Sequence, residues 1–128
     1  MSELNEDELT PNTLIEIQEN LALNNKMLII KFSAEWCAPC RKIKDIVHEN
    51  VKNLNENIIF VELDIDESLE LYGTLKTKKM VKGIPCILAY MGNKNRDVSK
   101  WYIPDDSVSG SNFEEINAFF ERCNKKVI

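Results

Sequence analysis

The sequence predicts an α/β fold in which helices cover both faces of a mixed parallel and antiparallel central sheet. Short apolar runs alternate with segments whose apolar residues recur at helical spacing, so strands and helices alternate along the chain. A strand–helix–strand unit implies a parallel pair with a right-handed crossover. A turn at Gly92-Asn93, between the last two apolar runs, predicts an antiparallel hairpin. The chain has 128 residues, which is enough for one domain with a buried core.

The chain begins with an acidic stretch, residues 1–9, which we expect to be a tail outside a domain that spans residues 10–128. Thr10 fits the N-cap of a first helix, with Pro11 at its first position, because a backbone N–H is not needed there. We expect this helix to end at residues 24–25, where two asparagines follow each other.

Four elements follow in the order strand, helix, strand, helix. We expect the first strand over residues 27–32, a helix over 37–54, a strand over 58–65, and a helix over 69–75 that ends before Gly83. Both strands are nearly continuous apolar runs, which is typical of strands that are covered on both faces. The helix over 37–54 carries apolar residues at the spacing of one buried face.

The remaining segment predicts the hairpin and a final helix. Its strands are expected over residues 86–90 and 98–103. The stretch Ser111-Asn112-Phe113-Glu114 fits a capping box before an amphipathic helix. We expect the buried face of this helix to contain Phe113, Ile116, Phe119, Phe120 and Cys123.

The composition argues against several classes of function. The net charge is −5, from 21 acidic and 16 basic residues, which provides no electrostatic footprint for nucleic acid. No apolar run approaches the roughly 20 residues that a membrane span needs, so we expect a soluble protein without a membrane partner. Residues 1–7 lack the basic and apolar regions of a secretory signal, which favours the cytoplasm, a reducing compartment.

The candidate reactive group is a C-x-x-C pair, Cys37 and Cys40, between a predicted strand and a predicted helix. Backbone N–H groups and the dipole at a helix start stabilise a thiolate, so we expect Cys37 to be the exposed nucleophile. Cys40 lies about one turn further in and would be the buried resolving thiol. Pro39 suits the first turn, and Trp36 would shield the thiolate and contact partners.

Two motifs resemble the thioredoxin family. Residues 32–41, Phe-Ser-Ala-Glu-Trp-Cys-Ala-Pro-Cys-Arg, differ from the family pattern W-C-G-P-C-K/R chiefly by Ala38 in place of glycine. Gly83-Ile84-Pro85 matches the family's G-I-P segment. The resemblance covers about residues 21–123, with both motifs at the strand and loop boundaries where the fold needs them. It implies the thioredoxin fold.

The resemblance also implies how a substrate would bind. The proline of the G-I-P segment is cis in the family and faces the two cysteines, a role that falls to Pro85. Ile84 would offer its backbone to an extended substrate segment. Gly110-Ser111 matches the family's Gly-Ala pair, which lines the same groove.

By this resemblance we expect a protein-disulfide reductase without a bound cofactor, whose redox-active group is a Cys37–Cys40 disulfide. Its partners would be client proteins with disulfides and a recycling reductase that depends on flavin and NADPH, and we expect a monomer. One alternative is a disulfide oxidase or isomerase partner. Another is a non-catalytic binding module on the same fold, with a purely structural disulfide.

A zinc site is a further interpretation of a C-x-x-C pair. It would need more ligands, but no second pair is present, and Cys86, Cys123 and His48 are far apart in sequence. We therefore predict no metal. Cys86 is expected to be a buried apolar residue, with a third redox thiol as the alternative. Cys123 is expected in the core, and His48 at the surface rather than as a catalytic base.

Two positions depart from the family pattern in charge. Thioredoxins usually carry a buried aspartate six residues before the first cysteine and a lysine next to it on the following strand. Here these positions are Lys31 and Glu62, so the signs are exchanged. We expect an ion pair, because a lone buried ammonium is costly, with Glu62 relaying the proton of Cys40. The alternative is that both side chains reach solvent at a sheet edge. Lys31, Glu62, Ala38 and Pro39 are therefore predicted to tune the thiols.

Two other segments differ in length or charge. The stretch between Gly92 and Gly110 is about ten residues longer than in the family pattern. The stretch over residues 66–85 is about four residues longer. Such insertions are commonly plain loop extensions. The alternative for the first is a longer hairpin near the substrate groove that narrows the choice of partner. Lys78, Lys79 and Lys82 form a basic cluster, interpreted as a solvated helix face or a partner contact.

Overall fold

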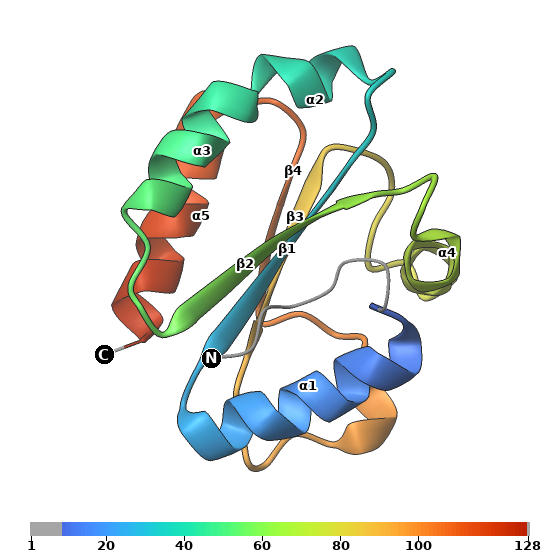
Figure 1. The fold of residues 1–128 in the computed structure, drawn as a ribbon, viewed down its shortest axis with the longest axis vertical. Helices are drawn as coiled ribbons and strands as arrows, with labels where there is room; N and C mark the ends of the chain where they lie inside the picture. The colour runs from blue at the N-terminus through green and yellow to red at the C-terminus, as the bar shows by residue number, and fades with distance from the viewer. Residues whose placement is uncertain (1–8, 128) are drawn as a thin grey trace.

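A mixed sheet lies between two layers of helices in the computed structural model, which describes residues 9–127, and this arrangement confirms the predicted α/β class (Figure 1). Most of the predicted tail lies outside the described residues. Its last residue, Leu9, is buried in the core cluster, so the packed domain begins before residue 10. No helix within residues 9–127 is long and apolar enough to cross a membrane.

The elements follow one another in nearly the predicted order. They are α1 (Pro11–Asn24), β1 (Met27–Ser33), α2 (Ala38–Lys42), α3 (Lys44–Lys52), β2 (Ile58–Asp64), α4 (Leu69–Thr77), β3 (Cys86–Met91), η2 (Val98–Lys100), β4 (Asp106–Ser109) and α5 (Phe113–Lys126). The start of α1 is as predicted: Thr10 is its N-cap and forms a capping box with Thr13. Asn25 ends this helix in the left-handed conformation.

The sheet has the strand order β2-β1-β3-β4. The central strand β1 is parallel to β2 and antiparallel to β3, and all of its residues are buried, as its apolar run predicts. Because β2 lies at an edge, it is less completely buried: Ile58, Val61 and Leu63 are buried, and its other residues are half-buried. Two registers matter for the site: Lys31 lies opposite Glu62, and Phe32 lies opposite Cys86.

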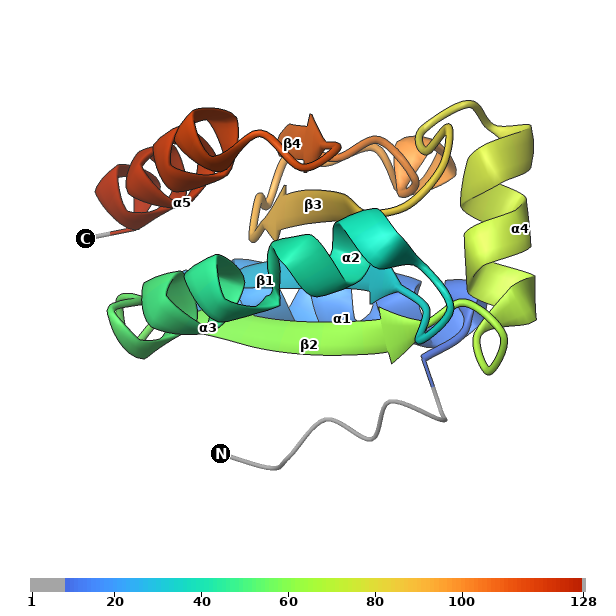
Figure 2. The same cartoon turned by 90° about the horizontal axis from the view of Figure 1, so that it is seen from above.

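Each face of the sheet has its own apolar cluster. On one face, α1 and α4 pack through Leu14, Leu21 and Leu75 against Phe32 and Tyr90. On the other face, α3 and α5 lie side by side (Figures 1 and 2) and contribute residues that include Val47, Phe119, Phe120 and Cys123. Asn50 of α3 donates a hydrogen bond to Asn117 of α5 at 2.8 Å. These layers fix β1 between them.

The helix predicted over residues 37–54 is two helices. The break lies at Ile43, whose φ of −97° and ψ of 0° interrupt the α-helical hydrogen bonding between α2 and α3. The final helix also begins differently from the prediction. Its N-cap is Asn112, which accepts the Glu115 N–H at 3.0 Å, and not Ser111. Phe113 is consequently exposed and lies off the buried face.

The strand predicted over residues 98–103 is wrong. Asp97 accepts hydrogen bonds from the backbone and side chain of Ser99, at 3.0 and 2.7 Å, and thereby starts the 3₁₀ helix η2. Val98 and Ile103 are exposed. The strand that pairs with β3 is instead β4, in which Ser109 lies opposite Cys86.

The long connection between β3 and β4 also lies away from the expected groove. Because β3 runs antiparallel to β1, it ends at Met91, opposite Met27 at the start of β1. The connection therefore lies at the end of the sheet opposite α2, next to α1 (Figure 1). Gln18 of α1 holds it by donating a hydrogen bond to the carbonyl of Trp101 at 2.8 Å. The alternative of a longer hairpin near the substrate groove is therefore wrong.

Gly92 lies so close to α1 that a larger residue there should destabilise the fold. A Cβ at this position would overlap the backbone of Leu21 and lie 2.8 Å from the backbone nitrogen of Ala22. We expect Gly92→Ala to lower the free energy of unfolding by about 2–3 kcal/mol, because one backbone must move. Gly73→Ala in α4 is the matched control, since its Cβ would meet nothing within 4 Å. Urea unfolding should show this control gaining about 0.5–1 kcal/mol. Equal stability of Gly92→Ala and the unaltered chain would contradict the contact.

Candidate active site

The two cysteines lie where the buried strand β1 passes into α2. Cys37 is the N-cap of α2, and Cys40 lies within its first turns. They form a disulfide with their Cα atoms 5.2 Å apart. Ala34, Ile65 and Ile84 pack against the pair. The structure therefore shows the oxidised state of the predicted dithiol.

The sulfur of Cys37 is held at the start of the helix. It accepts the backbone N–H of Cys40 at 3.3 Å. A helix start stabilises negative charge, so the same N–H would stabilise a Cys37 thiolate after reduction. The exposed fractions are 5% for Cys37 and 4% for Cys40. The expectation of an exposed Cys37 is therefore wrong for this state, because the loops beside it cover the sulfur.

Two loops from other parts of the chain meet at Cys37. The peptide bond between Ile84 and Pro85 is cis, as the resemblance implied. The carbonyl oxygen of Ile84 lies 4.0 Å from the Cys37 sulfur. Gly110 donates its N–H to the carbonyl of Pro85 at 3.0 Å, and its φ of 89° is one that glycine adopts without strain. The antiparallel pairing of β3 with β1 and β4 brings these loops to one end of the sheet.

Trp36 is the large apolar side chain at the surface of the site, with an exposed fraction of 64%. Its indole Nε1–H donates to the Asp66 carboxylate at 2.9 Å. Asp66, which lies in the loop after β2, therefore fixes the orientation of the Trp36 ring. Sequence reasoning assigned no role at the site to Asp66, because its only signal was that it closes a strand. Ala38 and Pro39 are exposed beside Trp36, and Ser111 is half-buried beyond Gly110.

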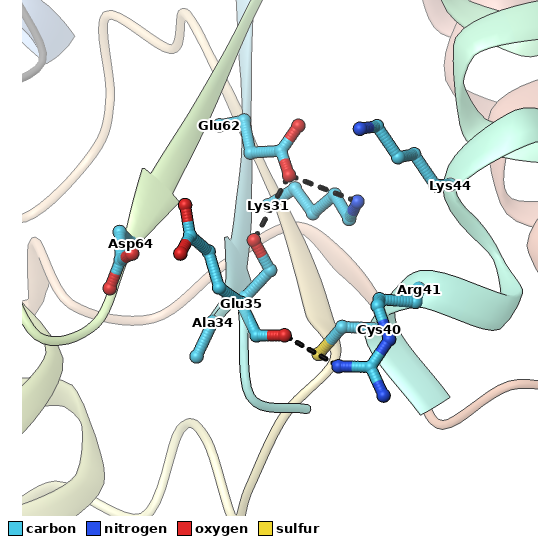
Figure 3. Close-up of a pocket in the computed structure, with 9 residues that line it drawn as sticks. Lys31, Ala34, Glu35, Cys40, Arg41, Lys44, Glu62 and Asp64 are labelled. Atoms are coloured by element: carbon cyan, nitrogen blue, oxygen red, sulfur yellow. Dashed lines mark hydrogen bonds and ion pairs between the residues drawn. The ribbon is translucent and has the colours of Figure 1, made fainter. Parts of the chain in front are cut away.

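A pocket of about 320 Å³ lies on the Cys40 side of the disulfide (Figure 3). Lys31 and Glu62 line it, and their Nζ and Oε2 atoms are 3.2 Å apart. Ser33 also donates to this Oε2, at 3.0 Å. Sequence reasoning missed Ser33, since an isolated serine at a strand end carries no signal of its own. The expected contact between Lys31 and Glu62 is therefore present in the structure.

The remaining cysteines and histidine lie outside the disulfide. Cys86 is buried and accepts a hydrogen bond from Ser109 at 3.5 Å. Burial raises the pKa of its thiol, against the lowering effect of this hydrogen bond. Cys123 is buried under α5, and burial raises its pKa to about 12. His48 is exposed. Within residues 9–127, no cluster of His, Cys, Asp and Glu side chains is suited to hold a metal ion.

The basic cluster of Lys78, Lys79 and Lys82 is exposed. Lys78 places its Nζ 4.7 Å from the centre of the Tyr102 ring, in the long connection before β4. This contact joins the end of α4 to that connection.

Comparison with known proteins agrees with this geometry. The family model for thioredoxin matches residues 9–111. Thioredoxin H5 of Oryza sativa is 32% identical over 114 residues, which cover 89% of this chain and 71% of that protein. Thioredoxin H2 of Arabidopsis thaliana is 44% identical over a shorter stretch, which covers 41% of this chain and 35% of that protein.

A solved structure shares the fold. The thioredoxin of Trichomonas vaginalis superimposes with a TM-score of 0.66 at 18% identity, over 92% of this chain and 98% of that one. At this identity the likeness concerns the fold alone. The matched family model and the rice relative extend the relationship to the sequence and to the segment that carries the C-x-x-C pair. The chain therefore belongs to the thioredoxin family of thiol–disulfide oxidoreductases.

Proposed function

We propose that this chain reduces disulfides of client proteins, with Cys37 as the attacking thiol and Cys40 as the resolving thiol. The observation that carries the assignment is the Cys40 N–H, which lies 3.3 Å from the Cys37 sulfur. A thiolate that accepts a backbone N–H at a helix start is stabilised, and the thiolate is the reactive form.

The reaction has two exchanges. The Cys37 thiolate attacks one sulfur of the client disulfide, so a Cys37–client bond forms and the other client sulfur leaves as a thiolate that takes up a proton. The Cys40 thiolate then attacks the Cys37 sulfur. This step breaks the Cys37–client bond, releases the second client sulfur as a thiolate that takes up a proton, and leaves the Cys37–Cys40 disulfide. Two electrons pass from the dithiol to the client.

The client segment would bind in extended form beside Cys37. Ile84 would offer its backbone there, because its carbonyl oxygen already lies 4.0 Å from the sulfur. The Gly110–Pro85 hydrogen bond holds the neighbouring loops at their present spacing, with Ser111 next along the same groove. Trp36, oriented by Asp66, would contribute apolar contact.

We propose that Glu62 accepts the proton that Cys40 loses before the second exchange. Glu62 and Cys40 line the same pocket, which gives the proton a route away from the buried sulfur. The hydrogen bonds from Lys31 and Ser33 would hold the Glu62 carboxylate in place for this role.

The family relationship supports client proteins with disulfides and a recycling reductase as the partners. We propose that this reductase depends on flavin and NADPH, and that the chain works as a monomer in the cytoplasm, in electron transport and redox homeostasis. No bound cofactor takes part in the two exchanges, because the dithiol supplies both electrons.

Replacing the resolving thiol tests the order of attack. We expect Cys40→Ser to accumulate mixed disulfides between Cys37 and client proteins, because the second exchange is blocked. Non-reducing electrophoresis and mass spectrometry of the trapped species measure this outcome. Cys37→Ser is the matched control and should trap far less. If the two variants trap equally, or if trapping occurs through Cys40, the assignment is contradicted.

Alkylation tests the roles of the two remaining cysteines. At about pH 8 we expect iodoacetamide to modify Cys37 in the reduced native protein, because the helix start favours its thiolate. Cys86 and Cys123 should stay unmodified, because burial raises the pKa of both thiols. Denaturant should make all four accessible. Mass spectrometry of the digested protein gives the result. Modification of native Cys86 as fast as Cys37 would favour a third redox thiol.

A further inference from the structure

The two members of the Lys31–Glu62 ion pair differ in their exposure to water. The Lys31 side chain is 1% exposed, whereas that of Glu62 is 36% exposed. Water and salt screen the field of an exposed charge far more than that of a buried one. Although the formal charges cancel, the field that reaches the interior from this pair is therefore positive.

Both members of the ion pair and Cys40 line the same pocket. In Figure 3 the Lys31 side chain extends from β1 toward the helix that carries Cys40 and Arg41. The pocket contains other charged groups of both signs: Arg41, Lys44, Glu35 and Asp64. The first three are exposed and the fourth is half-buried. Lys31 is therefore the one buried charge among the residues that line this pocket.

We propose that the Lys31 ammonium stabilises the Cys40 thiolate of the reduced protein and thereby makes the Cys37–Cys40 couple a stronger oxidant than it would be without this charge. Lys31 is thus a positioning residue that acts through the electric field and does not touch the substrate. The inference deepens the proposed function, because it relies on Cys40 being the resolving thiol of that reaction.

The direction of the shift in the redox equilibrium depends on which forms of Cys40 carry a charge. A cation attracts the Cys40 thiolate but has little effect on the neutral thiol or the disulfide, so it stabilises only the ionised reduced form. Stabilising the reduced form makes a disulfide more oxidising. The effect should therefore be present at alkaline pH, where Cys40 is ionised, and absent at acid pH, where both thiols carry their protons.

The test is the equilibrium of the whole chain with reduced and oxidised glutathione, measured from acid to alkaline pH. Lys31→Met replaces the ammonium with an apolar chain of similar length. We expect this variant to favour its disulfide by about threefold or more over the unaltered chain at alkaline pH. The two should coincide at acid pH. The pH at which the Cys40 thiol loses its proton, followed by thiolate absorbance, should rise in parallel.

Three further variants separate the field from the fold. Lys44→Met removes an exposed cation from the same pocket and should change the equilibrium much less than Lys31→Met. Glu62→Gln leaves the ammonium without its carboxylate and should shift the equilibrium in the opposite direction. Because a buried unpaired ammonium is destabilising, Glu62→Gln alone could unfold the protein. The double variant Lys31→Met/Glu62→Gln removes both charges and avoids this problem. Its glutathione equilibrium should shift in the same direction as that of Lys31→Met, but by less.

The outcomes are distinct from those that test the proposed function. Glutathione equilibration reports on the disulfide whether or not any client is reduced. If Lys31→Met and the double variant equal the unaltered chain at every pH, or shift in the opposite direction, the Lys31 proposal fails and client reduction is unaffected. If the unaltered chain cannot reduce client disulfides, the proposed function fails. The effect of Lys31 on the glutathione equilibrium is tested separately, by comparing Lys31→Met with the unaltered chain.

Discussion

The hydrogen bond from the Cys40 N–H to the Cys37 sulfur is the contact on which the chemistry of this chain depends. It exists because the buried central strand β1 ends at Ser33 and the chain enters α2 after the short turn over residues 34–37. The sulfur is thereby placed where a helix start favours negative charge. Antiparallel pairing of β3 with β1 then brings Pro85 to the same end of the sheet, so that one strand positions both the thiol and the Ile84–Pro85 loop beside it.

The same strand also determines which charged side chains lie near Cys40. β1 places Lys31 at the pocket beside Cys40, and its parallel neighbour β2 places Glu62 directly opposite Lys31. The exchange of charges relative to the family pattern is thus accommodated without a change of fold. The long connection before β4 varies at the other end of the sheet, where it packs on α1 through Gln18.

The sequence alone allowed the fold class, the position of the dithiol and the contact between Lys31 and Glu62 to be predicted. These features rest on strong signals: buried apolar runs, the Thr10-Pro11 cap and two motifs at the right boundaries. The failures have local causes. An Asp97–Ser99 cap competes with the strand pattern over 98–103, and the packing of Ile84 and Ala34 against the disulfide hides Cys37. Asp66 and Ser33 act through contacts between distant segments, which no local pattern encodes.

Cys37, and not Cys40, is the thiolate that attacks in the reaction proposed for this chain. The most direct measurement is the rate at which each cysteine of the reduced protein reacts with iodoacetamide as the pH is raised, followed by mass spectrometry of the two labelled positions. We expect Cys37 to react first, with the pH midpoint of its reaction rate at least one unit below the pKa of about 8.5 for a free cysteine. Faster reaction at Cys40, or a common midpoint near 8.5, would contradict it.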